Sequence, residues 1–309
     1  MSIQVKDLTH IYSPGMPDEQ KALDGVSFTI ADGEICAVIG HTGSGKSTLL
    51  QHLNALLKAT SGTILVDGVD VTAKDTVLRD IRRKVGLVFQ YPEYQLFEET
   101  VALDVAFGPK NLGLAADEVD RRVRDALALV GLPYEEVAAK SPFELSGGQK
   151  RRVAIAGVIA MEPAVLILDE PTAGLDPGAH KNILKMIRDI HDTRQNIILF
   201  VSHNMADVAA LADHILVMDR GKLVMDGTPH EVFSRRDELA AIGLDVPPAT
   251  DLLYHLRDKG VPVTTDALDI RTAAAEIGRV LKARRNGATG STGDRPETTG
   301  HSEGGEGAC

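Results

Sequence analysis

Long apolar runs are missing from this sequence. A helix that crosses a membrane needs about 20 consecutive apolar residues, whereas the best stretch here, residues 153–161, ends at Glu162 and Pro163. The first seven residues contain no basic segment that leads into an apolar one, as an export signal would. We therefore expect a protein that stays inside the cell, and work at a membrane would require another chain to supply the span.

Cysteine and positive charge are both scarce. The two cysteines, Cys36 and Cys309, provide no disulfide framework and no metal-ligand spacing. Cys36 lies in an apolar run, which predicts a small buried side chain, and Cys309 ends a polar tail as an expected exposed thiol. The 33 lysines and arginines against 44 acidic residues give a formal net charge of −11. This charge disfavours a bulk electrostatic grip on nucleic acid or an anionic membrane, and we expect no nucleic-acid partner.

Apolar material is sufficient for a folded core. Hydrophobic residues make up 43% of the 309 residues and charged residues 25%, which is typical of a soluble globular protein with one large or two modest domains. Short apolar runs alternate with helical periodicity, which predicts an α/β fold with a mainly parallel sheet and helices on both faces. Two flanking stretches, 3–8 and 26–30, resemble antiparallel strands added at one side. The runs that indicate strands buried on both faces are 35–39, 85–89, 165–168, 197–201 and 215–218.

Three segments are predicted along the chain. A large domain covers 1–239 and includes a helical lobe at about 100–160, where residues 117–130 carry apolar side chains at helical spacing. An appendix follows at 240–285, helical at 251–259 and 267–281 and extended at 261–263. Residues 286–309 contain no Val, Ile, Leu, Met or aromatic residue. We expect that tail to be disordered, because it cannot bury enough surface to offset its ordering entropy.

A glycine-rich stretch follows the apolar run at 35–39. It fits the pattern G-x-x-x-x-G-K-[ST] and opens a predicted helix at 47–57, which is the context that a phosphate-binding loop requires. Glycines let backbone N–H groups turn toward phosphate oxygens, and the helix N-terminus adds its dipole. We expect Lys46 to bridge the β- and γ-phosphates of ATP and the Ser47 hydroxyl to ligate Mg²⁺. The predicted nucleotide-binding residues are Gly40, His41, Thr42, Gly43, Ser44, Gly45, Lys46, Ser47 and Thr48.

Two acidic residues end the apolar run at 165–168. Side chains at the carboxyl ends of parallel strands face the ligand crevice. Asp169 is then expected to hold Mg²⁺ through water, and Glu170 to polarise a water molecule for attack on the γ-phosphate. Acidic residues are also common at helix N-termini, so the pair alone is weak evidence for this role. Together with the phosphate loop it becomes strong evidence. Glu170 argues against a small-molecule kinase, in which a bound hydroxyl group accepts the phosphoryl group.

A second anion site is predicted at 145–149. Ser146 suits the N-cap of the following helix, and Gly147 and Gly148 expose backbone N–H groups at its positive end. A capped helix with a flexible lead-in would account for the serine and the glycines, but not for the whole pentapeptide. Because we see one phosphate loop in the chain, we interpret Ser146, Gly147, Gly148 and Gln149 as a site for the γ-phosphate held by another subunit.

With these residues the chain resembles the ABC-type ATPase subunits. Leu145-Ser146-Gly147-Gly148-Gln149 matches the family's signature loop letter for letter, and the other elements follow in family order over about residues 2–233. The resemblance implies that Gln90 touches Mg²⁺ and senses a membrane partner. It also implies that His203 is a switch histidine on the γ-phosphate, that residues 174–176 link the two subunits' sites, and that Tyr12 lies under the adenine.

Each of these residues also has an ordinary interpretation. His203 could be a loop-edge histidine, Tyr12 a half-buried strand residue, and Gln90 an amide that bonds to the backbone at a strand end. Asp176 could cap a helix that has Pro177 in its first turn. We favour the functional interpretation because five motifs occur in one order.

A narrower resemblance is to the energy-coupling factor transporters, which import vitamins and cobalt or nickel ions. It rests on residues 89–101, His41, residues 141–144 and the start of the appendix at 243–247. The chain is most similar to the second of two paired ATPases, which implies a heterodimer with a sister ATPase, although some members form homodimers. It further implies a membrane scaffold subunit, a substrate-binding membrane subunit and a peripheral location at the cytoplasmic face of the cell membrane.

The resemblance therefore implies an enzyme that hydrolyses ATP to ADP and phosphate and powers the uptake of a vitamin or a transition-metal ion. We expect three aromatic residues and Leu96 within 91–97 to line a groove for a partner helix; packing against the helical lobe is the alternative. The appendix resembles a region that holds two ATPases together. The other functions considered are an ATPase of another ABC transporter type, a soluble ABC ATPase that acts on nucleic acid or the ribosome, and a regulatory ATP-binding module.

Overall fold

The structure, a computed structural model, describes residues 2–288, and residues 1 and 289–309 lie outside the described part. The tail that is predicted to be disordered lies outside it from residue 289 on. Residues 286–288, which the composition places in that tail, instead end helix α12 (Ile270–Ala288). Each residue added to an existing helix gains one hydrogen bond, so α12 continues past its last large apolar side chain, Leu281.

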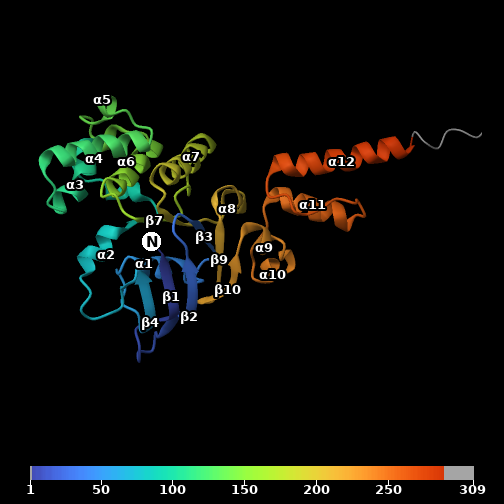
Figure 1. Ribbon diagram of the computed structural model, residues 1–309, viewed down its shortest axis with the longest axis horizontal. Helices are drawn as coiled ribbons and strands as arrows, with labels where there is room; N and C mark the ends of the chain where they lie inside the picture. Colours follow the sequence, from blue (N-terminus) through green and yellow to red (C-terminus); the bar gives the residue numbers. More distant parts are fainter. Residues whose placement is uncertain (1, 289–309) are drawn as a thin grey trace, which may run out of the picture.

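The main β-sheet has six strands in the order β10-β9-β3-β8-β7-β6 (Figure 1). The five strands from β9 to β6 are parallel, and β10 pairs with β9 as an antiparallel edge hairpin. This arrangement confirms the predicted α/β fold with a mainly parallel sheet. The strands are β3 (Ile35–Ile39), β6 (Val85–Val88), β7 (Val165–Asp169), β8 (Ile197–Val201), β9 (His214–Asp219) and β10 (Lys222–Gly227).

A second, antiparallel sheet has the order β2-β1-β4-β5. The antiparallel strands predicted at 3–8 and 26–30 are present as β1 and β2, and with β4 and β5 they form a sheet of their own. Side chains of β1 alternate between buried and more exposed along Ile3, Gln4, Val5 and Lys6, so one face of the sheet packs on a core. Such alternation identifies a strand but not its neighbours. The strands are β1 (Ile3–Tyr12), β2 (Gln20–Ile30), β4 (Ser61–Val66) and β5 (Val69–Asp70).

Two hydrophobic cores lie on opposite faces of the main sheet. On β3, Ile35, Ala37 and Ile39 belong to the core that the lobe helices cover, whereas Cys36 and Val38 face the antiparallel sheet and helix α1 (Lys46–Leu53). Helices thus lie on both faces, as expected, and the antiparallel sheet shares the second face with α1. All five residues of β3 are buried, so the phosphate loop that follows this strand starts from a rigid base.

Helices connect the strands. Helix α1 ends four residues before the predicted position 57, because the Asn54 side chain donates to the Val85 carbonyl of β6 and Ala55 adopts a φ of 55°. Among the described residues, no helix combines the length and the apolar character that a membrane span requires. The other helices up to the appendix are α2 (Leu78–Lys84), η1 (Pro92–Gln95), α3 (Val101–Asn111), α4 (Ala116–Leu129), α5 (Tyr134–Val137), η2 (Pro142–Glu144), α6 (Gly147–Ile159), α7 (Pro177–Arg194), α8 (Met205–Leu211), α9 (Pro229–Phe233) and α10 (Arg236–Ala241).

The appendix consists of α11 (Pro248–Asp258) and α12, which project beyond the sheets (Figure 1). Residues 261–263 are without helix or strand between them, and α12 begins three residues later than predicted. The two helices share a small core of their own that includes Leu253 and Val280. Leu244 and Val246, in the segment before α11, belong to the main core instead. The start of the appendix is therefore fixed to the body of the protein.

Candidate functional site

The glycine-rich loop between β3 and α1 fits tightly between two strands. A Cβ atom at Gly40 would lie 2.3 Å from the Met218 carbonyl oxygen of β9, and one at Gly45 would lie 2.6 Å from the Ala22 carbonyl oxygen of β2. Gly45 also has a φ of 103°, in the region that glycine tolerates. Both positions therefore require glycine, and the loop adopts the compact form in which its N–H groups can surround a phosphate.

Lys46 lies across this loop. Its Nζ donates to the Gly40 carbonyl at 2.7 Å and to the His41 carbonyl at 2.9 Å, and the residue is 6% exposed. Burial lowers the pKa of Lys46 below its usual value, and the nearby Glu170 and Asp169 carboxylates offset only part of this shift. The ammonium group thus faces both the loop and the acidic end of β7, where a nucleotide phosphate would exchange with the two carbonyls.

Three polar side chains of the loop region make different contacts. His41 Nε2 lies 2.8 Å from Asp219 Oδ1 at the end of β9, so this ring braces the loop from outside. The hydroxyl of Ser44 is buried without a hydrogen-bond partner among the described residues, which leaves one polar atom for a ligand to satisfy. Thr48 Oγ1 lies 3.2 Å from the Tyr12 hydroxyl, so Tyr12, 38% exposed, stands beside the start of α1.

Ser47 and Asp169 form an oxygen pair next to the loop. Ser47 Oγ donates to Asp169 Oδ2 at 3.0 Å. Burial raises the pKa of Asp169, and the Ser47 hydroxyl partly counteracts this effect. A hydroxyl and a carboxylate are the donors that Mg²⁺ prefers, so these residues fit the metal that the sequence predicts.

Side chains from the ends of three neighbouring strands meet at Glu170. Gln90 Nε2 donates to Glu170 Oε2 at 2.7 Å, and His203 Nε2 lies 2.9 Å from Glu170 Oε1. Both carboxylate oxygens are thus engaged. The backbone φ of Glu170 is 49°, an uncommon value for a residue other than glycine that persists only where neighbouring structure enforces it. The structure brings together the predicted base, switch histidine and strand-end glutamine.

The signature loop lies at a different cavity. Ser146 Oγ accepts from the Gln149 N–H, and Gln149 Oε1 accepts from the Ser146 N–H at 3.0 Å, which makes a capping box at the start of α6. Ser146, Gly147, Gly148 and Gln149 border this cavity together with the 174–176 loop, and no residue of the phosphate loop lines it. Asp176 caps α7 by accepting from the Gly178 and Ala179 N–H groups, as its ordinary interpretation predicts.

Arg151 is a buried residue that the sequence reasoning missed. It is 1% exposed on α6, and its guanidinium donates to both oxygens of Glu93 in η1, at 3.0 and 2.8 Å. It also donates to the carbonyls of Pro171 and Ala173, directly after Glu170. The sequence did show an arginine among the apolar residues of a predicted helix, which could have indicated a buried ion pair. Its partners could not be identified, because they are distant in sequence.

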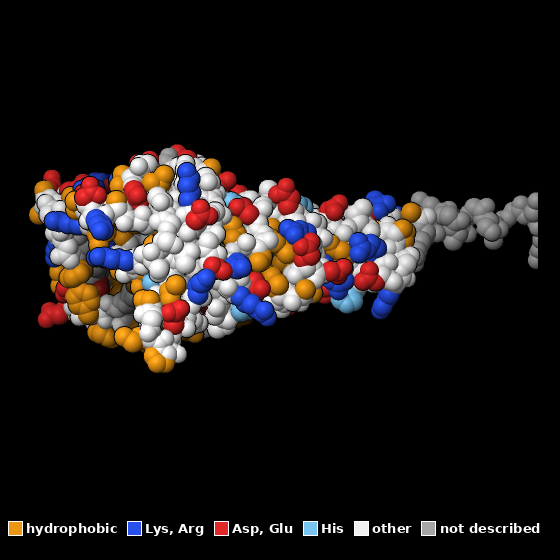
Figure 2. Space-filling view, turned by 90° about the horizontal axis from the view of Figure 1, so that it is seen from below, with side chains coloured by type: hydrophobic (Ala, Val, Ile, Leu, Met, Phe, Trp, Pro, Cys, Tyr) orange, Lys and Arg blue, Asp and Glu red, His pale blue; other side chains and the backbone are white. Residues whose placement is uncertain are grey.

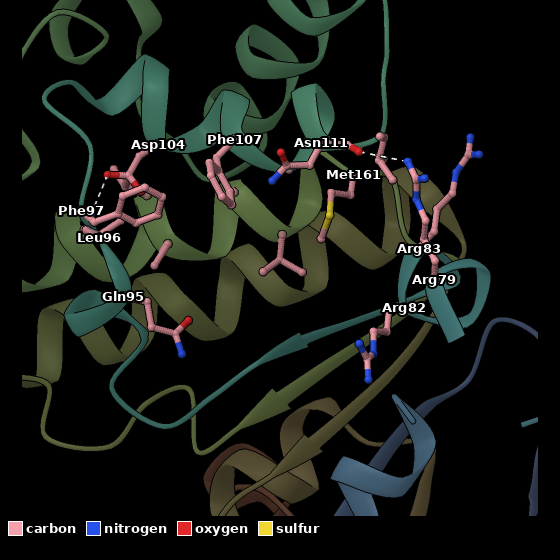
Figure 3. A pocket seen from close by; sticks show the side chains of 16 residues that line it. Arg79, Arg82, Arg83, Gln95, Leu96, Phe97, Asp104, Phe107, Asn111 and Met161 are labelled. Carbon is pink, nitrogen blue, oxygen red and sulfur yellow. Dashed lines mark hydrogen bonds between the residues drawn. The ribbon is translucent and has the colours of Figure 1, made fainter. Parts of the chain in front are cut away.

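An apolar groove runs between α2, α3 and α6 (Figure 3). Leu96, Phe97 and Phe107 lie toward one end near Asp104, and three arginines of α2 lie at the other end. In Figure 2, hydrophobic side chains adjoin blue lysines and arginines at the end of the molecule that carries the lobe. The expectation that all three aromatic residues of 91–97 line the groove is wrong for two of them. Tyr94 is 85% exposed outside it, and Tyr91 stacks toward Arg151 instead, with 5.7 Å between guanidinium and ring centre.

Comparison with known proteins gives consistent matches. The ABC transporter family model matches residues 23–173. The energy-coupling factor transporter ATP-binding protein EcfA2 of Clostridium tetani is 54% identical over 289 residues, which cover 94% of this chain and 99% of that protein. EcfA2 of Clostridium acetobutylicum is 55% identical over 285 residues, which cover 92% of this chain and 100% of that protein.

Solved structures agree with the fold. The structure of cbiO1 from Clostridium perfringens, described as part of the ABC transporter complex cbiONQ, matches with a TM-score of 0.70 and 38% identity over 83% of this chain and 98% of that chain. The ATP-binding cassette MJ0796, a dimer in a post-hydrolysis state bound to ADP and Pi, matches with a TM-score of 0.65 and 28% identity over 73% of this chain and 98% of that chain.

Proposed function

This chain belongs to the energy-coupling factor transporter ATP-binding proteins, a family of ABC transporter ATPases, and from this membership we propose how its residues couple ATP to transport. It is an ATP-hydrolysing subunit that powers the uptake of a vitamin or transition-metal ion through separate membrane subunits. We assign the catalytic residues from one observation: Gln90 and His203 both contact the Glu170 carboxylate beside the phosphate loop.

Nucleotide binding begins at Lys46. The two loop carbonyls that it contacts are weaker partners than phosphate oxygens, because a bond between two charged groups is stronger. The β- and γ-phosphates of ATP therefore replace those carbonyls, and the loop N–H groups complete the cradle. Ser47 and Asp169 would hold Mg²⁺, which would neutralise part of the phosphate charge. Tyr12, beside Thr48, offers a ring face to the adenine.

Hydrolysis requires that Glu170 change partners. A general base needs a free oxygen to accept a proton from water, and both Glu170 oxygens are engaged by Gln90 and His203. We assign the release of this carboxylate to nucleotide binding: His203 turns to the γ-phosphate, and the Gln90 side chain would help to hold Mg²⁺. Glu170 then orients the attacking water, and the loop N–H groups with Lys46 stabilise the developing charge.

The site needs a second subunit. Because the signature residues Ser146, Gly147, Gly148 and Gln149 border a different cavity from the phosphate loop, they serve the ATP of a partner, and the partner's signature loop closes this chain's site. A heterodimer with a sister ATPase is the arrangement we propose. A homodimer is the alternative outcome, since every half-site element is present in this chain.

The groove between α2, α3 and α6 is proposed as the seat of the membrane scaffold subunit, at the cytoplasmic face of the cell membrane. Phe97 and Phe107 are 58% and 45% exposed there, which leaves apolar area for a partner helix to cover. Glu93, in η1 just before Leu96, reaches Arg151 and through it the loop after Glu170. This contact path connects the groove to the catalytic carboxylate.

Affinity purification of the chain from detergent-solubilised native membranes, followed by mass spectrometry, tests the proposal. We expect a sister ATPase and a membrane scaffold to copurify. Phe107→Asp should lose the scaffold and keep the sister ATPase. Leu252→Asp, at a similarly exposed position (49%) on the appendix, should keep the scaffold. Ribosomal or DNA-repair proteins in place of any membrane protein would overturn the transport role and leave the ATPase chemistry standing.

A further inference from the structure

Asp207 is a buried carboxylate to which no role has yet been assigned. It lies in α8, four residues after His203, and is 4% exposed. Its Oδ1 lies 2.8 Å from His180 Nε2, and its Oδ2 accepts a hydrogen bond from Thr172 Oγ1 at 3.3 Å. A carboxylate this deeply buried is stable only while it keeps such partners, so movement of either partner also moves α8.

The two partners belong to two further segments of the site. Thr172 lies two residues after Glu170, and His180 lies in the first turn of α7, directly after the 174–176 loop. Glu170, Thr172, His180 and His203 also border one cavity, whose far wall includes Asp245 at the start of the appendix. One side chain therefore joins the loop that carries the base, the loop that faces the second subunit and the helix that follows the switch histidine.

Helix capping does not account for Asp207. An acidic side chain in the first turn of a helix can serve its N-terminus alone. In α8 that task already belongs to Asn204, whose Oδ1 accepts from the N–H groups of Ala206 and Asp207. The Asp207 carboxylate instead points its two oxygens at side chains of other segments.

We propose that Asp207 is a positioning residue that, through Thr172 and His180, sets the placement of Glu170 relative to His203 and transmits movement of the 174–176 loop to both. The proposal rests on the proposed function, because it takes Glu170 as the base and His203 as the switch. The strained φ of Glu170 requires a neighbourhood that fixes it, and the bond from Thr172 to Asp207 is one such constraint.

Steady-state ATPase kinetics of the complex that the chain forms with its partners test this role. His180→Ala should lower kcat about tenfold, the cost of one charge-assisted hydrogen bond, with the KM for ATP changed less than twofold. His180→Arg again supplies a hydrogen-bond donor to Asp207 and should recover most of the loss. Asp207→Asn should also lower kcat, and its effect should not add to that of His180→Ala, because both remove the same contact.

A matched control separates positioning from packing. His214 makes a similar contact, with its Nε2 2.5 Å from Asp226 Oδ1, at the edge of the main sheet. His214→Ala should leave kcat unchanged, and its loss of Tm should not exceed that of His180→Ala, because Asp226 is more exposed than Asp207. Unchanged kcat in His180→Ala, equal loss of kcat in both variants, or no recovery in His180→Arg would each overturn the proposal. Brisk turnover by Glu170→Gln would instead overturn the assignment of the base, so the two failures are distinguishable.

Discussion

Replacing Arg151 with methionine removes a side chain that joins Glu93, in η1 before the groove, to the loop after Glu170. Methionine is similar in length and apolar, so the variant fills much of the volume and deletes the charge and the donors. What remains is Glu93, whose side chain is 17% exposed, and two backbone carbonyls at Pro171 and Ala173 that lose their hydrogen bonds.

The cost follows from the burial of Arg151. Removal of one partner from a buried ion pair destabilises a protein by about 3–5 kcal/mol, because the other charge is left uncompensated. For a domain of this size, that loss lowers the Tm by roughly 10 °C. Arg152→Met is the control: Arg152 donates only to the Val130 and Gly131 carbonyls, and its loss should cost about 1 kcal/mol.

The pH dependence gives this prediction a second readout. Burial raises the pKa of Glu93, but the hydrogen bonds and charge of Arg151 together with a backbone hydrogen bond outweigh it, and the net pKa is lowered from 4.5. A carboxylate with a lowered folded-state pKa contributes stability above its unfolded pKa, and this contribution disappears as the pH falls through the folded pKa. The difference in unfolding free energy between wild type and Arg151→Met should therefore be full at pH 7 and shrink below about pH 4.5.

Calorimetry or urea unfolding at pH 7 and pH 4, on nucleotide-free protein, measures both quantities. If Arg151→Met and Arg152→Met destabilise the chain equally, or if the difference between wild type and Arg151→Met does not change with pH, the buried ion pair is not the source of the stability. The contact path from Glu93 through Arg151 to the loop after Glu170 would then contribute too little energy to connect the groove with the catalytic carboxylate.

Three further predictions concern the nucleotide site. Lys46→Ala should lose ATP affinity in a fluorescent-nucleotide titration, and unchanged affinity would contradict the phosphate assignment. Glu170→Gln should bind ATP and accumulate as a closed dimer in size-exclusion chromatography, with phosphate release at least a hundredfold slower, in line with the loss of a general base. Asp169→Asn should raise the Tm of the nucleotide-free chain at pH 7 and abolish turnover. Because the pKa of Asp169 is raised by burial, its charged form destabilises the fold at pH values above the unfolded pKa of 3.8; a Tm that falls would refute this reasoning.

The sequence was sufficient for the parts of the site that depend on local chemistry. The phosphate loop, the acidic pair after β7 and the capping box at Ser146 are each encoded within a few consecutive residues, and parallel strands bring their carboxyl ends to one edge. This logic predicted the position of Glu170, and the family resemblance added Gln90 and His203, which the structure places in contact with it.

Pairings between distant residues could not be predicted in this way. The alternation in β1 predicted an antiparallel strand but not its partners, and β4 and β5 were not predicted because these short strands lack a long apolar run. Arg151 and Glu93 are 58 residues apart in sequence, and neither residue type indicates a partner by itself. Phe107 of the groove could equally have been an ordinary apolar residue of α3, since its exposure of 45% is visible only in the folded chain.

The two buried charges that the sequence did not reveal act on the same short loop. Arg151 holds the carbonyls of Pro171 and Ala173 from α6, and Asp207 holds the Thr172 hydroxyl from α8. The loop after Glu170 is thus fixed from two sides, which explains how Glu170 keeps its uncommon φ. Arg151 extends to the groove through Glu93, and Asp207 extends to the 174–176 loop through His180. A signal from the membrane partner and a signal from the second subunit would therefore converge on the same loop beside Glu170, so we expect substitutions of Arg151 and His180 to have non-additive effects on kcat.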